Sequence, residues 1–293
     1  SKNGGFYAIH PFLQTLLRHL DRSETLYEVI QKIFSASTSS DSALSQQLLP
    51  HAESLLHYLE ENGSSWSGEL AKVLLVLGNI YEGIGNYPAK LELMLRHLKA
   101  VENEGGVDSP EFGEALYRVA STYVQIGSYR KGEELALKAA AALKRASSSF
   151  YGHHWEKAQI ENGWVLSAAY FGQCKFQAAV EGLTELLKYL ENRPSTPTNI
   201  ELRNATLIRL AEVQLTLGKS AALDPSVIEQ LLKQQSESLG DDHPDTLTTK
   251  AMQLELSEKW TSACFYFDKV LKLQEASYGA DHPILTRILL KGG

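Results

Sequence analysis

The sequence contains little cysteine and little proline. Its two cysteines, Cys174 and Cys264, lie 90 residues apart, and no Cys or His residues have the spacing of a zinc site. We therefore expect no metal site and no disulfide framework. We interpret both cysteines as half-buried small hydrophobic residues in a reducing compartment. Only 9 prolines accompany 43% hydrophobic residues, which excludes a wholly disordered chain.

Long apolar runs are absent as well. None approaches the roughly 20 residues that cross a bilayer, and no signal-peptide pattern opens the chain, so we expect a cytoplasmic protein without a membrane partner. The net charge of −7 argues against a nucleic-acid partner. No Ser/His/Asp or Cys/His set has the context of a nucleophile. We expect neither catalysis nor a bound cofactor.

A short pattern recurs along the chain. Leu77-Gly78 with Tyr81, Gly85 and Tyr87 matches Val119-Ala120 with Tyr123, Gly127 and Tyr129 at an offset of 42 residues. Weaker copies follow, and intervals of 42, 47, 44 and 40 residues separate their small residues. Those small residues are Gly78, Ala120, Ser167, Ala211 and Ala251. Recurrence at this spacing indicates stacked structural repeats, and the irregular intervals indicate loop insertions, which such stacks tolerate.

The pattern has a physical explanation. Each unit fits two amphipathic helices joined by a tight turn, and the small residue lies where the two helices cross closely. The glycine seven residues later can adopt a positive φ and end the first helix. One such hairpin cannot bury its apolar face alone, so copies must stack.

The turns between units repeat too. Residues 106–110, 240–244 and 279–283 share the form Gly-x-Asp-(His or Ser)-Pro. We expect the Gly to end one helix, the Asp or the next polar residue to cap the following helix, and the Pro to occupy its first turn.

These motifs resemble the tetratricopeptide repeat (TPR) in its 42-residue variety, as found in kinesin light chains. The resemblance implies an all-α, right-handed superhelical solenoid of antiparallel helix pairs. Residues 67–291 would form about five units and the start of a sixth. The sequence departs from the pattern at Lys90 and Gly132, which replace an Ala of the second helix, and at Gln214, which replaces a Tyr.

The first 66 residues do not fit the repeat. Ile9, His10, Leu13 and Gln14 resemble the end of a winged-helix domain in signal-transduction NTPases of the NB-ARC (STAND) type. That resemblance implies a winged-helix remnant over residues 1–22 and connecting helices over residues 23–66. It also implies that the chain is the sensor arm of a larger protein.

In the TPR family the first helices of successive units line a concave groove that holds a protein or peptide partner. The resemblance places the following residues there: Leu75, Asn79, Glu82, Tyr117, Arg118, Ser121, Gln125, Trp164, Ala168, Phe171, Ile208, Arg209 and Glu212. Aromatic and Arg side chains often dominate interface energies. An alternative is that the aromatic residues pack against the next repeat and that the basic residues are ordinary solvated surface.

We therefore predict a protein-interaction scaffold, the sensing and regulatory arm of a signal-transduction NTPase. Two alternatives remain open. The chain could be a cargo adaptor of the kinesin-light-chain kind, or a repeat domain that regulates an attached enzyme. The terminal repeats are candidates for self-association.

Overall fold

The computed structural model describes residues 49–50, 53, 56–57, 67–147, 153–217, 225–283, 285–286 and 288. The predicted winged-helix remnant, residues 1–22, lies outside these residues. So does most of the predicted connecting region, although the described residues between 49 and 57 are helical.

The described part of the chain is helical and contains no strand. Five helices are the first members of pairs: α4 (Ser67–Ile84), α6 (Pro110–Gln125), α8 (His153–Gly172), α10 (Pro197–Thr216) and α12 (Pro244–Leu256). Each is followed by a second member: α5 (Tyr87–Gly105), α7 (Tyr129–Ser147), α9 (Phe176–Glu191), α11 (Pro225–Leu239) and α13 (Trp260–Tyr278). The all-helical prediction of successive helix pairs is confirmed.

The chain divides into two compact units, residues 1–107 and 108–293. The first contains the α4/α5 hairpin, in which Gly78 lies against the buried Met94. A Cβ atom at Gly78 would lie 2.2 Å from the Met94 terminal methyl carbon, so a larger residue would force the Met94 side chain to shift. Lys90, in the slot predicted for Ala, is buried and forms an ion pair of 2.8 Å with Glu82.

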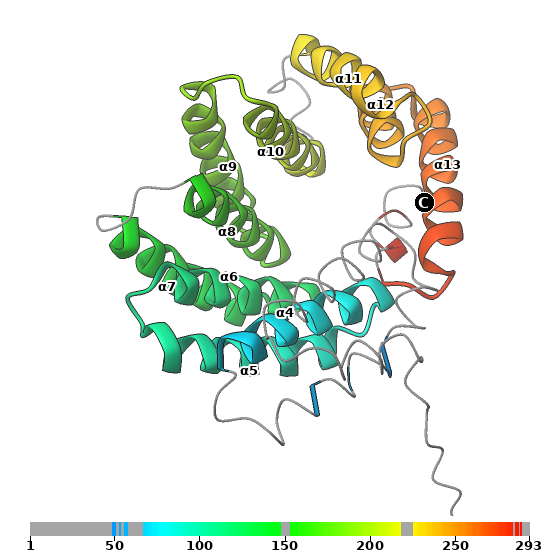
Figure 1. Ribbon diagram of the computed structural model, residues 1–293. Coiled ribbons are helices and arrows are strands. Elements are labelled where there is room, and N and C mark those ends of the chain that lie inside the picture. The colour runs from blue at the N-terminus through cyan, green and yellow to red at the C-terminus, as the bar shows by residue number, and fades with distance from the viewer. Residues whose placement is uncertain are drawn as a thin grey trace, which may run out of the picture. The chain divides into compact units, whose positions relative to one another are not determined.

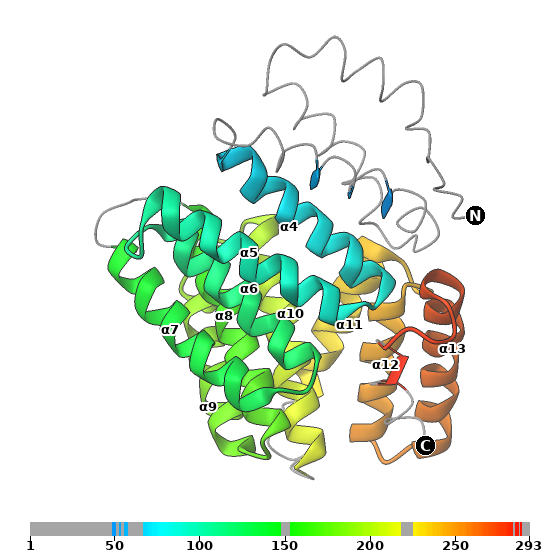
Figure 2. The same cartoon turned by 90° about the horizontal axis from the view of Figure 1, so that it is seen from below.

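The second unit contains α6 to α13, which follow one another in chain order in a curved row (Figure 1). Figure 2 shows α12 and α13 side by side. The predicted small residues are all buried here: Ala120, Ala211 and Ala251 are fully inaccessible, and Ser167 is 4% exposed. Burial of this recurring position is what allows each first helix to approach its neighbours closely.

The turns within pairs share one geometry. Gly85 and Gly127 have φ of 80° and 81°, and Cys174 and Glu258 take the same role with φ of 59° and 57°. In each turn the next backbone N–H donates to the carbonyl five residues earlier, as Ser128 does to Tyr123 at 2.8 Å. This is the hydrogen bond of a Schellman motif. The equivalent Gly218 lies outside the described residues.

The turns between pairs also match the prediction. Gly106, Gly240 and Gly279 have φ of 74°, 92° and 89°. Ser109 accepts the Phe112 N–H at 3.1 Å to cap α6. His243 Nδ1 accepts the Asp245 N–H at 3.2 Å to cap α12. The capping residue is thus the polar residue after the Asp, and Pro begins the helix.

Candidate partner-binding surface

Neighbouring first helices of the second unit are joined by side-chain hydrogen bonds. The Tyr117 hydroxyl on α6 donates to the Glu161 carboxylate on α8 at 2.5 Å. The Trp164 indole N–H on α8 donates to the Thr206 hydroxyl on α10 at 2.9 Å. These contacts align α6, α8 and α10 so that one side of each helix contributes to a shared surface.

Tyr117 and Trp164 occupy the same repeat position, three residues before the small residue. Tyr117 is only 6% exposed, and Trp164 is half-buried. Ile208, at the same position of α10, packs against the cluster that contains Met252 of α12. Tyr117 and Trp164 therefore reach the following first helix, which favours the alternative that this position packs against the next repeat.

Tyr117 lies in a charged environment. The Arg118 guanidinium lies 5.4 Å from the Tyr117 ring centroid and forms an ion pair of 2.6 Å with Glu114. Burial raises the pKa of Tyr117 well above its usual range; Arg118 opposes the rise, and Glu161 adds to it through its charge and hydrogen bond. Tyr117 is therefore a neutral hydrogen-bond donor at physiological pH.

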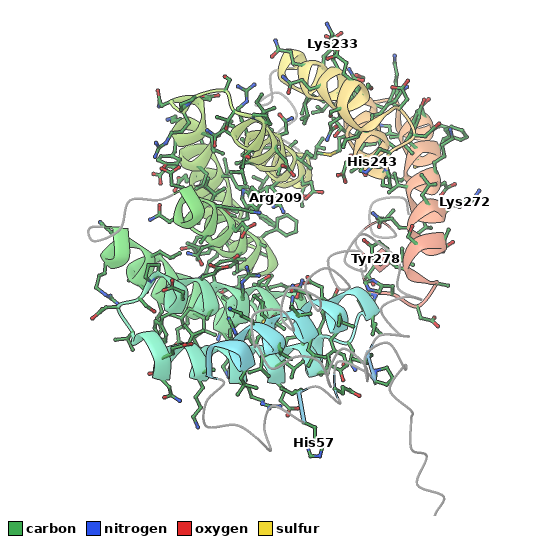
Figure 3. The ribbon with its side chains drawn as sticks, in the orientation of Figure 1. His57, Arg209, Lys233, His243, Lys272 and Tyr278 are labelled. Atoms are coloured by element: carbon green, nitrogen blue, oxygen red, sulfur yellow. The ribbon has the colours of Figure 1, made fainter. Side chains whose placement is uncertain are left out.

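Arg209 on α10 and Trp164 on α8 form a cation–aromatic contact between two first helices. The Arg209 guanidinium lies 4.2 Å from the Trp164 ring centroid, within the range of a cation–π interaction. Its Nη1 donates to the Ala205 carbonyl at 2.9 Å, which fixes the side chain along its own helix. Both residues are half-buried, and Arg209 lies on the concave side of the row (Figure 3).

The other predicted groove residues of the second unit lie on the same helices. Gln125, Ala168 and Phe171 are exposed, and Ser121 and Glu212 are half-buried. Phe171 contacts Phe176 edge-on, with 5.3 Å between ring centroids, and remains 37% exposed. Phe171 follows Trp164 by two turns of α8. Because exposed aromatic side chains often carry binding energy, Phe171 is a candidate contact for a partner.

The predicted residues of the first unit are a separate group. Leu75, Asn79 and Glu82 are half-buried on α4, and Glu82 pairs with Lys90. They belong to the first compact unit, whereas α6, α8 and α10 belong to the second.

Three residues of this surface escaped the sequence prediction: Glu114, Glu161 and Thr206. A signal existed for the two glutamates, since both lie six residues before the small residue of successive units. Nothing in the repeat pattern distinguishes Thr206, whose role depends on the position of the Trp164 indole N–H.

One sequence prediction is wrong. Cys174 and Cys264 are both exposed rather than half-buried. Cys174 lies with a positive φ in the tight turn after α8, and Cys264 lies on the exposed side of α13.

Within the described ranges, no cluster of three His, Cys, Asp or Glu side chains could hold a metal ion. No described helix is both long and apolar enough to cross a membrane.

Comparison with known proteins bears on the fold. No family model and no curated protein matches the sequence. Among solved structures, a Rap protein in complex with Competence and Sporulation Factor superposes with a TM-score of 0.62 at 14% identity, covering 95% of this chain and 73% of that one. The chain has the fold of TPR-like repeat proteins.

Kinesin-light-chain repeats from Podosopora anserina, described as nearly identical and TPR-like, give a TM-score of 0.50 at 18% identity. This match covers 69% of this chain and 93% of that one. A second structure of the same repeats gives the same score and identity and covers 94% of that chain. These identities are low, so the likeness concerns the fold.

Proposed function

We propose that this protein is an interaction scaffold that binds a polypeptide segment along the concave side of α8 and α10. The fold supports this proposal, because helix pairs stacked in a curved row present an extended surface of the kind that repeat proteins use for binding. The solved Rap protein with a similar fold is in complex with a factor. We expect no catalytic activity from the chain itself.

The observation that carries the proposal is the Arg209–Trp164 stack. It joins two first helices across 4.2 Å and leaves both side chains half-buried. Such a stack is already ordered, so a partner that contacts it loses less conformational entropy at the interface. Phe171 and Ala168 continue the surface along α8, and both are exposed. Arginine and aromatic side chains are the types that most often carry binding energy.

The experiment is a selection of displayed random peptides on the immobilised protein, followed by fluorescence anisotropy with a synthetic selected peptide. Arg209→Glu and Phe171→Ala should each weaken its binding at least about tenfold, the effect of losing one interface contact of roughly 1.4 kcal/mol. Both variants should keep the circular dichroism of the wild type.

Lys188→Glu is the matched control. Lys188 is exposed on α9, a second helix, so reversing its charge should leave the affinity unchanged. Equal affinity of wild type, Arg209→Glu and Phe171→Ala for every selected peptide would refute the proposed surface.

We further infer a sensor arm of a signal-transduction NTPase, acting in the cytoplasm. Support comes only from the sequence, through Ile9, His10, Leu13 and Gln14, which lie outside the described residues. A nucleotide-binding domain encoded directly upstream of Ser1 is the expected finding. An upstream heptad coiled coil would instead favour a cargo adaptor, a role that the likeness to kinesin-light-chain repeats also supports.

A further inference from the structure

Unmatched buried polar atoms gather on three consecutive helices of the second unit. Among the described residues, five of the seven buried side-chain oxygens without a hydrogen-bond partner lie on α10, α11 and α12. They belong to Asn204 and Gln214 on α10, Gln235 on α11, and Thr246 and Thr249 on α12. The two threonines are 2% and 1% exposed. In the described parts of α6 and α7 no such atom occurs.

This concentration weakens the packing. A buried polar atom without a partner costs about 1–3 kcal/mol, whereas a matched buried hydroxyl contributes favourably. Thr122 on α6 is fully buried as well, but its hydroxyl donates to the Arg118 carbonyl at 2.9 Å. The α10–α12 junction thus bears a cost that the α6/α7 pair does not.

Apolar contacts at the junction do not compensate. The cluster that joins α10, α11 and α12 consists of aliphatic side chains only: Ala211, Ile228 and Met252, with Ile208, Leu215 and Leu256 around them. The preceding cluster, around Ala179 and Leu183, includes Trp164, Tyr170 and Phe176. At the position of Tyr170 the fourth unit has Gln214, so the larger apolar side chain is lost where the junction forms.

The pairing of helices also changes here. In the other units the second helix packs closely on its own first helix, as α7 does on α6 and α13 on α12. In the fourth unit α11 packs mainly on the following helix, α12. Figure 1 shows α11 alongside α12. The helices α11, α12 and α13 therefore form one group, and α6 to α10 form another.

We propose that the α10–α12 junction is a hinge at which α11–α13 moves as a body against α6–α10. Within each body consecutive helices contact one another closely, whereas α10 contacts α11 and α12 at few positions. The apolar cluster between the two bodies is aliphatic. Interfaces of this kind open at the smallest free-energy cost in a folded chain, and rigid-body motion concentrates there. The hinge exists whether or not α8 and α10 bind a partner.

The chain offers its own probes for this motion. Its two cysteines are exposed, and one lies in each body: Cys174 after α8 and Cys264 on α13. Spin labels on both sulfurs allow the distance between the bodies to be measured by double electron–electron resonance. We expect the wild-type distance distribution to be broad or to have two maxima.

Replacing Thr246 and Thr249 by Val keeps the shape of both side chains and removes two unmatched hydroxyls. In the Thr246→Val/Thr249→Val variant the Cys174–Cys264 distance distribution should narrow to one maximum. Thr122→Val is the matched control, because it alters a buried threonine whose hydroxyl has a partner. It should leave the distribution broad.

A pair within one body gives the reference width. Lys138→Cys combined with Cys264→Ser places labels on the exposed Lys138 position of α7 and on Cys174, both in α6–α10. The hinge is refuted if the wild-type Cys174–Cys264 distribution is as narrow as this reference. It is refuted equally if Thr122→Val narrows the distribution as much as the double Val variant does.

Discussion

The residue seven positions after each small residue controls the turn within a helix pair. In the described units it is Gly85, Gly127, Cys174 or Glu258, always with a positive φ. A side chain in this conformation costs roughly 1–2 kcal/mol because its Cβ crowds the following carbonyl oxygen. The chain tolerates this cost at Cys174 and Glu258 and avoids it at the two glycines.

Replacing Gly127 by Ala should therefore lower the free energy of unfolding by about 1 kcal/mol. A Cβ at this position would meet no atom within 4 Å, so the loss would come from the backbone alone. Urea unfolding followed by circular dichroism measures it. Cys174→Ala is the control at the equivalent turn, and its effect should be near zero because a side chain is already present. Equal losses for both variants would contradict this explanation.

The raised pKa of Tyr117 makes the free energy of unfolding fall as the pH rises into the alkaline range. Its pKa in the folded protein is raised, first by burial, so the neutral phenol is the form that the fold favours. The stabilisation is complete below the unfolded-state pKa of about 10 and is lost as the pH rises above it. The free energy of unfolding should fall less between pH 9 and pH 11 for Tyr117→Phe than for the wild type. Urea titrations at each pH measure it. Identical losses for both proteins would contradict the assignment.

The repeat pattern predicted the burial of single residues but not the side-chain bonds between units. The buried small residues followed from period and size alone, because close helix crossings exclude long side chains. The bonds from Tyr117 to Glu161 and from Trp164 to Thr206 join residues 44 and 42 positions apart on neighbouring units, and they depend on side-chain rotamers. A sequence pattern without coordinates does not determine such pairings.

At the scale of single helices, several helices start at a residue whose side chain caps the first turn. Ser109 caps α6 and Thr196 caps α10, each by accepting a backbone N–H three residues later. The α13 helix begins differently, because Lys259 at its N-cap makes no side-chain capping bond. The three Gly-x-Asp-(His or Ser)-Pro segments made the starts after residues 109 and 243 predictable.

Ser109→Ala should destabilise the second compact unit by about 1 kcal/mol, since the Phe112 N–H would lose its acceptor at the first turn of α6. The measurement is the midpoint and slope of urea unfolding. Lys259→Ala removes no cap and should shift the midpoint little. If the lysine variant lost as much stability as the serine variant, capping would not explain the repeated turn.

The fourth unit is where element-level prediction reached its limit. The substitution of Gln214 for Tyr was visible in the sequence. The consequence, that α11 packs mainly on α12, was not. Local propensity sets the length of α11, but its partner depends on which neighbouring face buries more apolar area.

For the whole molecule, the sequence predicted stacked helix pairs because one hairpin cannot bury its own apolar face. It did not predict the division into two compact units at residue 107, since the repeat period continues across that point. The function also belongs to this scale. A surface shared by α8 and α10 exists only when neighbouring repeats are aligned, as the Trp164–Thr206 bond and the Arg209–Trp164 stack align them.

The most direct test of the proposed function is amide hydrogen exchange of the full chain with and without a selected peptide. Binding along the concave side should slow exchange in α8 and α10 and leave the exposed flank of α9 unchanged. Protection confined to α9 or α13, with α8 and α10 unaffected, would contradict the account.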